Sequence, residues 1–184
     1  ICFPELSITG YTCADLFLQT VLQRKAFDAL MELVAFMDDK ESLIAIVGLP
    51  LLFKNRLYNV AAAISSQGIL GFVPKQEIPN HNEFNEKRWF TSGVDLHDEI
   101  VKTSVGYHPF SSSLIFETQH AKFGIEIGKD LWTLTPPSSL LSLEGVDIIF
   151  NLSASSEAVG KHSYRKSLVV NQSARCNAAY VYAG

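Results

Sequence analysis

Three short segments of this 184-residue chain place polar or charged side chains at the ends of apolar runs. They are Phe3-Pro4-Glu5-Leu6, Val73-Pro74-Lys75, and the run GIEIGKDLW from Gly124 to Trp132. In sheets covered by helices, sites tend to form in the loops at strand ends. A carboxylate (Glu5) and an ammonium (Lys75) facing one pocket suit amide hydrolysis through a thioester. The carboxylate moves the proton from a thiol to the leaving ammonia, and the ammonium stabilises the oxyanion.

The elements that must position these segments alternate between strands and helices. Hydrophobic periodicity predicts helices over residues 14–37, 136–143 and 161–176. Apolar runs predict strands over residues 43–49, 57–64, 69–73, 114–117, 123–127, 146–151 and 178–182. Two strand pairs are close enough in sequence for hairpins, which favours an α/β (α+β) fold with mixed sheets covered by helices over a simple parallel sheet.

Composition narrows the class of protein. The chain is 47% hydrophobic and 18% charged, with a net charge of -4, so we expect one globular domain and neither nucleic acid nor membrane as a partner. Three cysteines without CxxC spacing and five histidines without ligand spacing predict no disulfide framework, no metal site and a cytoplasmic location. The chain begins without Met, inside a strand-like run, so we expect an excerpt of a longer protein.

Five ordered motifs carry a family resemblance: FPELSITGY, GFVPKQEIPNHNEFNEKRWF, GIEIGKDLW, NLSASSEAVGKHSYR and SARCNAAYVYAG. Over the whole chain the sequence resembles the nitrilase, or carbon-nitrogen hydrolase, superfamily, and most closely the glutaminase domain of glutamine-dependent NAD synthetases. The resemblance implies a four-layer α-β-β-α sandwich, incomplete at both ends here. Residues 1–184 would then form a partial glutamine amidotransferase domain, without the synthetase domain.

The family uses a Glu-Lys-Cys triad, and the resemblance assigns two of its members. Glu5 matches the general base, Lys75 matches the lysine, and Glu83 matches a second glutamate that positions the lysine and the substrate amide. The family pattern resembles GVEICEDLW in the third segment, so Gly128 stands at the position of the nucleophilic cysteine. Lys129 stands where the family has an acidic residue.

The resemblance also implies which residues hold the glutamine substrate. These predicted substrate-binding residues are Asn85, Lys129, Ser153, Ser155, Lys161 and Arg165. Hydroxyl and guanidinium groups suit a zwitterionic amino acid, although Ser153 and Ser155 suit equally well the role of capping the following helix. The Lys129 backbone N–H is a candidate oxyanion donor, and Asn85 replaces a tyrosine that is frequent in the related synthetases.

The implied function is hydrolysis of L-glutamine to glutamate and ammonia for NAD synthesis. The domain itself would need no cofactor; ATP and magnesium would serve the synthetase domain of the same polypeptide, and a homo-oligomer is expected. Two alternatives stay open: a stand-alone amidase or carbamoylase, and a non-catalytic homologue that binds a ligand or serves in assembly. Three explanations are open for glycine in place of the family cysteine at position 128: deliberate mutation, natural divergence and a sequence error. The neighbouring change to Lys129 favours natural divergence.

Overall fold

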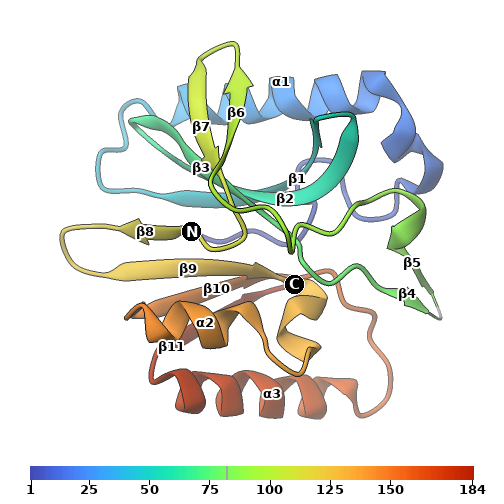
Figure 1. Ribbon diagram of the computed structural model, residues 1–184, viewed down its shortest axis with the longest axis vertical. Helices are drawn as coiled ribbons and strands as arrows, with labels where there is room; N and C mark the ends of the chain where they lie inside the picture. Colours follow the sequence, from blue (N-terminus) through green and yellow to red (C-terminus); the bar gives the residue numbers. More distant parts are fainter. Residues whose placement is uncertain (82) are drawn as a thin grey trace.

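Two β-sheets lie face to face between two layers of helix in the computed structural model, which describes residues 1–81 and 83–184 (Figure 1). One helix, α1 (Thr20–Phe36), covers the outer face of the first sheet and follows a short 3-10 helix, η1 (Ala14–Leu18). Two helices, α2 (Pro137–Leu143) and α3 (Lys161–Cys176), cover the outer face of the second sheet. The predicted α-β-β-α sandwich with mixed sheets is confirmed.

The first sheet has five strands in the order β1-β2-β3-β7-β6. These are β1 (Ala45–Phe53), β2 (Arg56–Ser65), β3 (Gly68–Pro74), β6 (Glu99–Thr103) and β7 (Gly106–Phe110). Neighbours pair antiparallel except β3 and β7, which run parallel. Outside the named strands, Cys2 forms a parallel bridge with Ile46 on the free side of β1.

The second sheet has four strands in the order β11-β10-β9-β8. These are β8 (Ile115–Glu117), β9 (Lys122–Ile127), β10 (Ile148–Leu152) and β11 (Ala179–Ala183). The pairs β9–β10 and β10–β11 are parallel, and β8–β9 is antiparallel. A third, two-stranded ribbon of β4 (Asn80–His81) and β5 (Phe84–Asn85) follows β3 and leads into the 3-10 helix η2 (Glu86–Arg88).

Alternating side chains of the first sheet explain why it is buried on both faces. On β2, Tyr58, Val60, Ala62 and Ile64 pack under α1, whereas Ala61 and Ala63 face the second sheet. Successive side chains of a strand point to opposite faces, so one run serves two cores. The residues between the sheets include the small side chains of Ala61 and Ala63, which let the second sheet approach closely. Both are fully buried.

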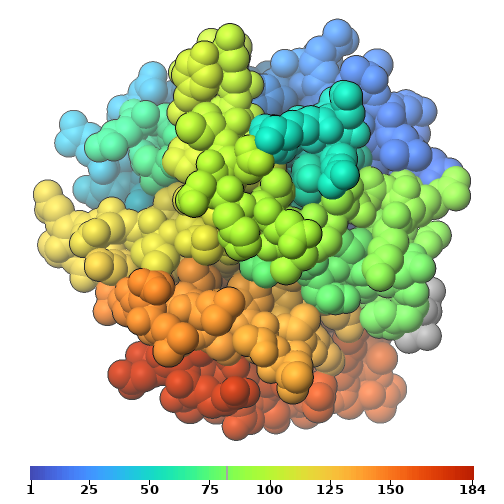
Figure 2. Space-filling view, in the orientation of Figure 1, coloured from blue at the N-terminus to red at the C-terminus, as the bar shows by residue number. Residues whose placement is uncertain are grey.

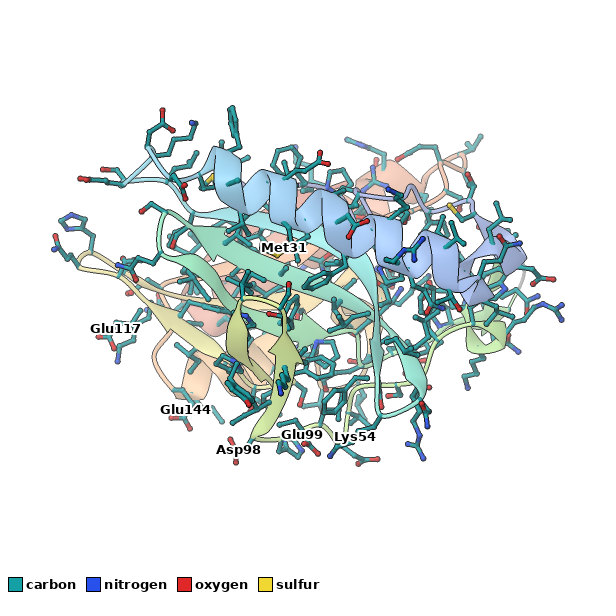
Figure 3. The ribbon with its side chains drawn as sticks, turned by 90° about the horizontal axis from the view of Figure 1, so that it is seen from above. Met31, Lys54, Asp98, Glu99, Glu117 and Glu144 are labelled. Atoms are coloured by element: carbon teal, nitrogen blue, oxygen red, sulfur yellow. The ribbon has the colours of Figure 1, made fainter. Side chains whose placement is uncertain are left out.

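A tight turn joins β1 to β2 at Lys54 and Asn55, which have φ angles of 46° and 60°. Positive φ at both central positions is typical of the two-residue turns that suit hairpin twist. The Lys54 ammonium pairs with the Glu99 carboxylate of β6 at 2.8 and 2.9 Å, on an exposed edge (Figure 3). Pro50 lies within β1 and is tolerated there because β1 is the outer strand of the five named ones.

The segment after β3, green in Figure 2, lies on the surface at the right of the molecule, between the blue elements above and the orange and red elements below. No helix or strand was predicted in this stretch, and the structure forms the β4–β5 ribbon and η2 there. The hairpin of β6 and β7 was also missed, because both strands are short and β7 contains Pro109. The predicted hairpins at 57–73 and 114–127 are confirmed, as is the helix at 161–176. Within the described residues, no helix is both long and apolar enough to cross a membrane.

Candidate active site

Glu5, Lys75 and Glu86 form a buried triad of charges. The Lys75 Nζ lies 2.5 Å from Glu5 Oε1, and 2.7 and 2.9 Å from the two carboxylate oxygens of Glu86. All three residues are at most 3% exposed. The Asn59 side chain on β2 donates a further hydrogen bond of 2.7 Å to Glu5 Oε1. One buried ammonium group thus pairs with two buried carboxylates.

The first sheet fixes the position of both Glu5 and Lys75. Lys75 directly follows β3, and its backbone N–H donates to the Asn59 carbonyl oxygen at 2.8 Å. Glu5 precedes Leu6, which adopts a φ of 52° where the chain turns over β1. This turn packs on Gly48, where an added Cβ would lie 2.3 Å from the Leu6 backbone nitrogen. Glycine at position 48 is therefore a condition for the placement of Glu5.

Burial and the neighbouring charges shift the pKa values of the triad. Burial raises the pKa of Glu5, Lys75 lowers it, and the neighbouring Glu86 raises it again. Burial acts to lower the pKa of Lys75, but Glu5 and Glu86 outweigh it, so that pKa is raised and the ammonium stays charged. A carboxyl group with a raised pKa accepts a proton more readily than an ordinary carboxylate does.

Gly128 forms an elbow directly beneath this triad. It follows β9, begins the 3-10 helix η3 (Gly128–Trp132), and has a φ of 53°. A Cβ built on Gly128 would lie 2.6 Å from Glu5 Oε2 and 3.4 Å from Lys75 Nζ. The structure thus brings Glu5, Lys75 and the elbow together, with any side chain at position 128 directed at the carboxylate and the ammonium.

Asp130 holds the elbow in place. Its carboxylate accepts hydrogen bonds from the backbone N–H groups of Ile127 (2.9 Å), Glu77 (2.7 Å) and Gln76 (3.1 Å). These bonds connect the elbow of the second sheet to the segment that follows Lys75 on the first. Burial raises the pKa of Asp130 to about 8, and the backbone hydrogen bonds act to lower it.

Besides Asp130, the buried carboxyl group of Glu126 also stabilises the elbow. Its Oε2 accepts the backbone N–H of Ser138 at 2.8 Å, and the Tyr180 hydroxyl donates to its Oε1. Asn151 on β10 reaches both Glu126 Oε1 and the Gly128 carbonyl oxygen at 3.4 Å. Burial raises the pKa of Glu126. The elbow therefore rests on a network of hydrogen bonds that belongs to the second sheet.

The structure corrects the assignment of the second glutamate. Glu83 was predicted to position Lys75, but its side chain is exposed and accepts a hydrogen bond from Ser156 Oγ at 2.5 Å. Glu86, three residues later in η2, makes the contact with Lys75. The physical reason is packing: Phe90, four residues after Glu86, is buried against Phe17, so this turn directs Glu86 inward.

A small cavity of about 10 Å³ lies at the triad, with room for about one water molecule. Its lining residues are Glu5, Lys75, Phe84, Glu86, Gly128, Lys129, Trp132, Ser153, Ala154 and Ser155. A second cavity of about 410 Å³ lies outside it and shares Lys129 and Trp132 with the first. Lys129 and Trp132 therefore form the wall between the buried site and the outer cavity.

The predicted substrate-binding residues divide into two groups. Lys129, Ser153 and Ser155 line the small cavity. Asn85, Lys161 and Arg165 do not line it.

The residues outside the cavity have other partners. Asn85 is exposed on β5. The Lys161 ammonium binds Ser156 Oγ at 2.8 Å and lies 5.6 Å from the Phe84 ring centroid, next to the cavity. Arg165 pairs with Glu157 at 2.6 Å and lies over the Tyr182 ring. The Ser153 hydroxyl accepts a hydrogen bond from Tyr182, and no side-chain bond caps α3, whose N-cap is Gly160.

Sequence reasoning missed three residues of the site: Glu86, Asn59 and Phe84. The only sequence signal for Glu86 is its spacing of four residues from Phe90, and the burial of Phe90 became known from the structure. Phe84 covers the triad from β5 and is 7% exposed, with Tyr11 packed edge-on against its ring. Asn59 offered no signal, because it lies inside a long apolar strand whose position over Glu5 depends on tertiary structure.

Comparison with known proteins identifies the family. The family model described as carbon-nitrogen hydrolase matches residues 1–183. Glutamine-dependent NAD(+) synthetases from Mycobacterium tuberculosis and Saccharomyces cerevisiae are 35% and 32% identical over 98% of this chain. The chain spans 27% and 26% of the length of these relatives.

Solved structures agree with this result. A glutamine-dependent NAD(+) synthetase from Cytophaga hutchinsonii superposes with a TM-score of 0.87 at 30% identity, over 98% of this chain and 29% of that one. An amidase of the nitrilase superfamily from Nesterenkonia shares the fold, with a TM-score of 0.77 at 14% identity, over 99% of this chain and 61% of that one. The match of the family model to residues 1–183 shows that the chain belongs to the carbon-nitrogen hydrolase family.

Proposed function

We propose that this domain binds the side-chain amide of L-glutamine as the glutaminase part of a glutamine-dependent NAD synthetase. The observation that carries the proposal is the convergence of Glu5 and Lys75 on the elbow at Gly128, within 2.6 and 3.4 Å of a Cβ at that position. The names of the similar synthetases support glutamine as the substrate. Delivery of ammonia to a synthetase domain that uses ATP and magnesium, and assembly into a homo-oligomer, are further parts of the proposal.

With a cysteine at position 128 the geometry supports a two-step hydrolysis. Glu5 takes the thiol proton, and the sulfur attacks the amide carbon to form a C–S bond. The tetrahedral oxyanion lies near the Lys75 ammonium, and the C–N bond breaks as Glu5 returns the proton to ammonia. Water, deprotonated by Glu5, then attacks the thioester carbon; the C–S bond breaks, which yields glutamate and restores the thiol.

Gly128 supplies no atom that can form the thioester. In this chain the Glu5 carboxylate occupies the space next to the elbow, where Oε2 also accepts the Ala154 backbone N–H at 3.1 Å. Loss of a catalytic nucleophile costs on the order of 10⁶-fold in turnover. We therefore propose that the chain with Gly128 binds the amide without hydrolysing it, which favours a ligand-binding role over turnover for this sequence.

A pair of substitutions tests the proposal. The Gly128→Cys protein should release ammonia from L-glutamine, whereas Gly128→Ala, which adds the same Cβ but no thiol, should not. Titration calorimetry on the protein with Gly128 should show binding of L-glutamine without ammonia release. A folded Gly128→Cys protein that releases ammonia faster from simple amides would support the alternative of a stand-alone amidase. No ammonia from any amide, together with no binding, would overturn the proposal.

A further inference from the structure

Lys129 carries an ammonium group at the entrance of the site. Its Nζ lies 4.3 Å from the Trp132 ring centroid and 5.3 Å from that of Phe84, so two aromatic faces hold the side chain in place. The residue lines both the small cavity at Glu5 and the outer cavity of about 410 Å³. Lys129 therefore lies between the outer cavity and the triad, within reach of a ligand that extends from one to the other.

Among the described residues, the charge of Lys129 has no acidic ion-pair partner. Within residues 1–81 and 83–184, no carboxylate lies within ion-pairing distance of its Nζ, although eight other ion pairs are formed. The two acidic side chains that raise the pKa of Lys129 have other partners: Glu86 binds Lys75, and Glu83 binds Ser156. An ammonium held at a cavity wall without an anion leaves a favourable position for one.

A second ammonium group, that of Lys161, lies near Lys129 at this entrance. The Lys161 ammonium lies on the same Phe84 ring, 5.6 Å from its centroid. Burial, Lys161 and Lys75 lower the pKa of Lys129, whereas Glu83 and Glu86 raise it. A second lysine this close disfavours a ligand ammonium beside Lys129 and favours a carboxylate. Glu77, which lines the outer cavity, is the acidic side chain that faces the ligand on its way in.

We infer that Lys129 binds a carboxylate of the ligand, so that the site takes side-chain amides of dicarboxylic acids and does not require an α-ammonium group. The inference rests on the proposed function, because it assumes that the amide end of the ligand reaches Glu5 and Lys75. Glutaramate, which is glutamine without the α-amino group, distinguishes this inference from the proposed function. Glutaramate should bind at least as tightly as L-glutamine.

Gly128 makes the test simple, because binding can be measured at equilibrium on the protein as it stands. Calorimetry with L-glutamine, glutaramate and butyramide separates the contributions of the ammonium, the carboxylate and the amide. Lys129→Met keeps the packing against Trp132 and removes the charge, so the Kd of glutaramate should rise by about tenfold or more, as for a lost charge-assisted hydrogen bond. Lys129→Glu should reverse the preference in favour of L-glutamine. Lys102→Met, on the exposed face of β6, serves as the matched control and should leave each Kd unchanged.

The outcomes separate the inference from the function on which it rests. The inference is wrong if glutaramate binds the Lys129→Met protein as tightly as it binds the unaltered protein. It is also wrong if the unaltered protein binds L-glutamine much more tightly than glutaramate. In both cases the proposed function stands. If the unaltered protein binds none of the three amides, the proposed function fails and the inference fails with it.

Discussion

Replacing Gly128 with alanine should destabilise the protein by two separable effects. The first is backbone strain, because a residue with a Cβ costs about 1–2 kcal/mol at a φ of 53°. The second is the contact with Glu5, whose Oε2 would lie 2.6 Å from the new Cβ. The carboxylate must retreat by roughly 1 Å to restore van der Waals contact, which stretches its hydrogen bond to Ala154. Weakening a bond to a charged group costs about 1.5 kcal/mol or more.

We therefore expect Gly128→Ala to lower the free energy of unfolding by about 3 kcal/mol. Gly145→Ala is the matched control, because Gly145 has a φ of 78° after α2 and nothing within 4 Å of an added Cβ. That variant should cost only the backbone strain, about 1 kcal/mol. Urea unfolding of both variants measures the difference. Equal losses at the two positions would refute the placement of Glu5 against the elbow.

Three further predictions concern the charges. Glu86→Gln should lower the free energy of unfolding by about 3 kcal/mol because it disrupts a buried ion pair, whereas Glu83→Gln should change it by less than about 0.5 kcal/mol; equal effects in chemical unfolding would contradict the structure. The pKa of Asp130 is raised to about 8 in the folded protein, so the folded state binds a proton that the unfolded state has lost. Stability should therefore fall as pH rises from about 5 to 8. In thermal unfolding measured over this pH range, Tm should fall less steeply with pH for Asp130→Asn than for the unaltered protein. Lys54→Met should cost less than about 1 kcal/mol, since its ion pair is exposed, and a drop of several degrees in Tm beyond that range would show a larger role.

Much of the fold was accessible from the sequence because single elements carry strong local signals. The helix of residues 161–176 has a clear helical pattern, and the structure gives the same bounds. The strand predicted to stop at residue 49 continues through Pro50 to Phe53, because an outer strand tolerates a proline that an inner strand would exclude. The predicted helix of residues 14–37 is instead a 3-10 turn and an α-helix, separated at Gln19, where the backbone is extended.

The site was less accessible, because its residues come from segments far apart in sequence. The strand-end pattern pointed to Glu5 and Lys75, which the structure brings within 2.5 Å of each other. Pattern alone did not decide between Glu83 and Glu86, because both lie in one polar stretch and only the packing of the following aromatic residue distinguishes them. Asn59 needed the complete sheet, since nothing local marks a buried amide within an apolar strand.

The triad and its elbow belong to different sheets, and this has a mechanical consequence. Lys75 is anchored to the first sheet and Gly128 extends from the second, so the gap between the sheets sets their separation. Glu5 turns over β1 and is also bonded to Ser153 and Ala154 after β10. The methyl groups of Ala61 and Ala63 lie in that gap. A bulkier side chain at either position would push the two sheets apart and move the groups on the first sheet away from the elbow. Every residue of the cavity would keep its identity.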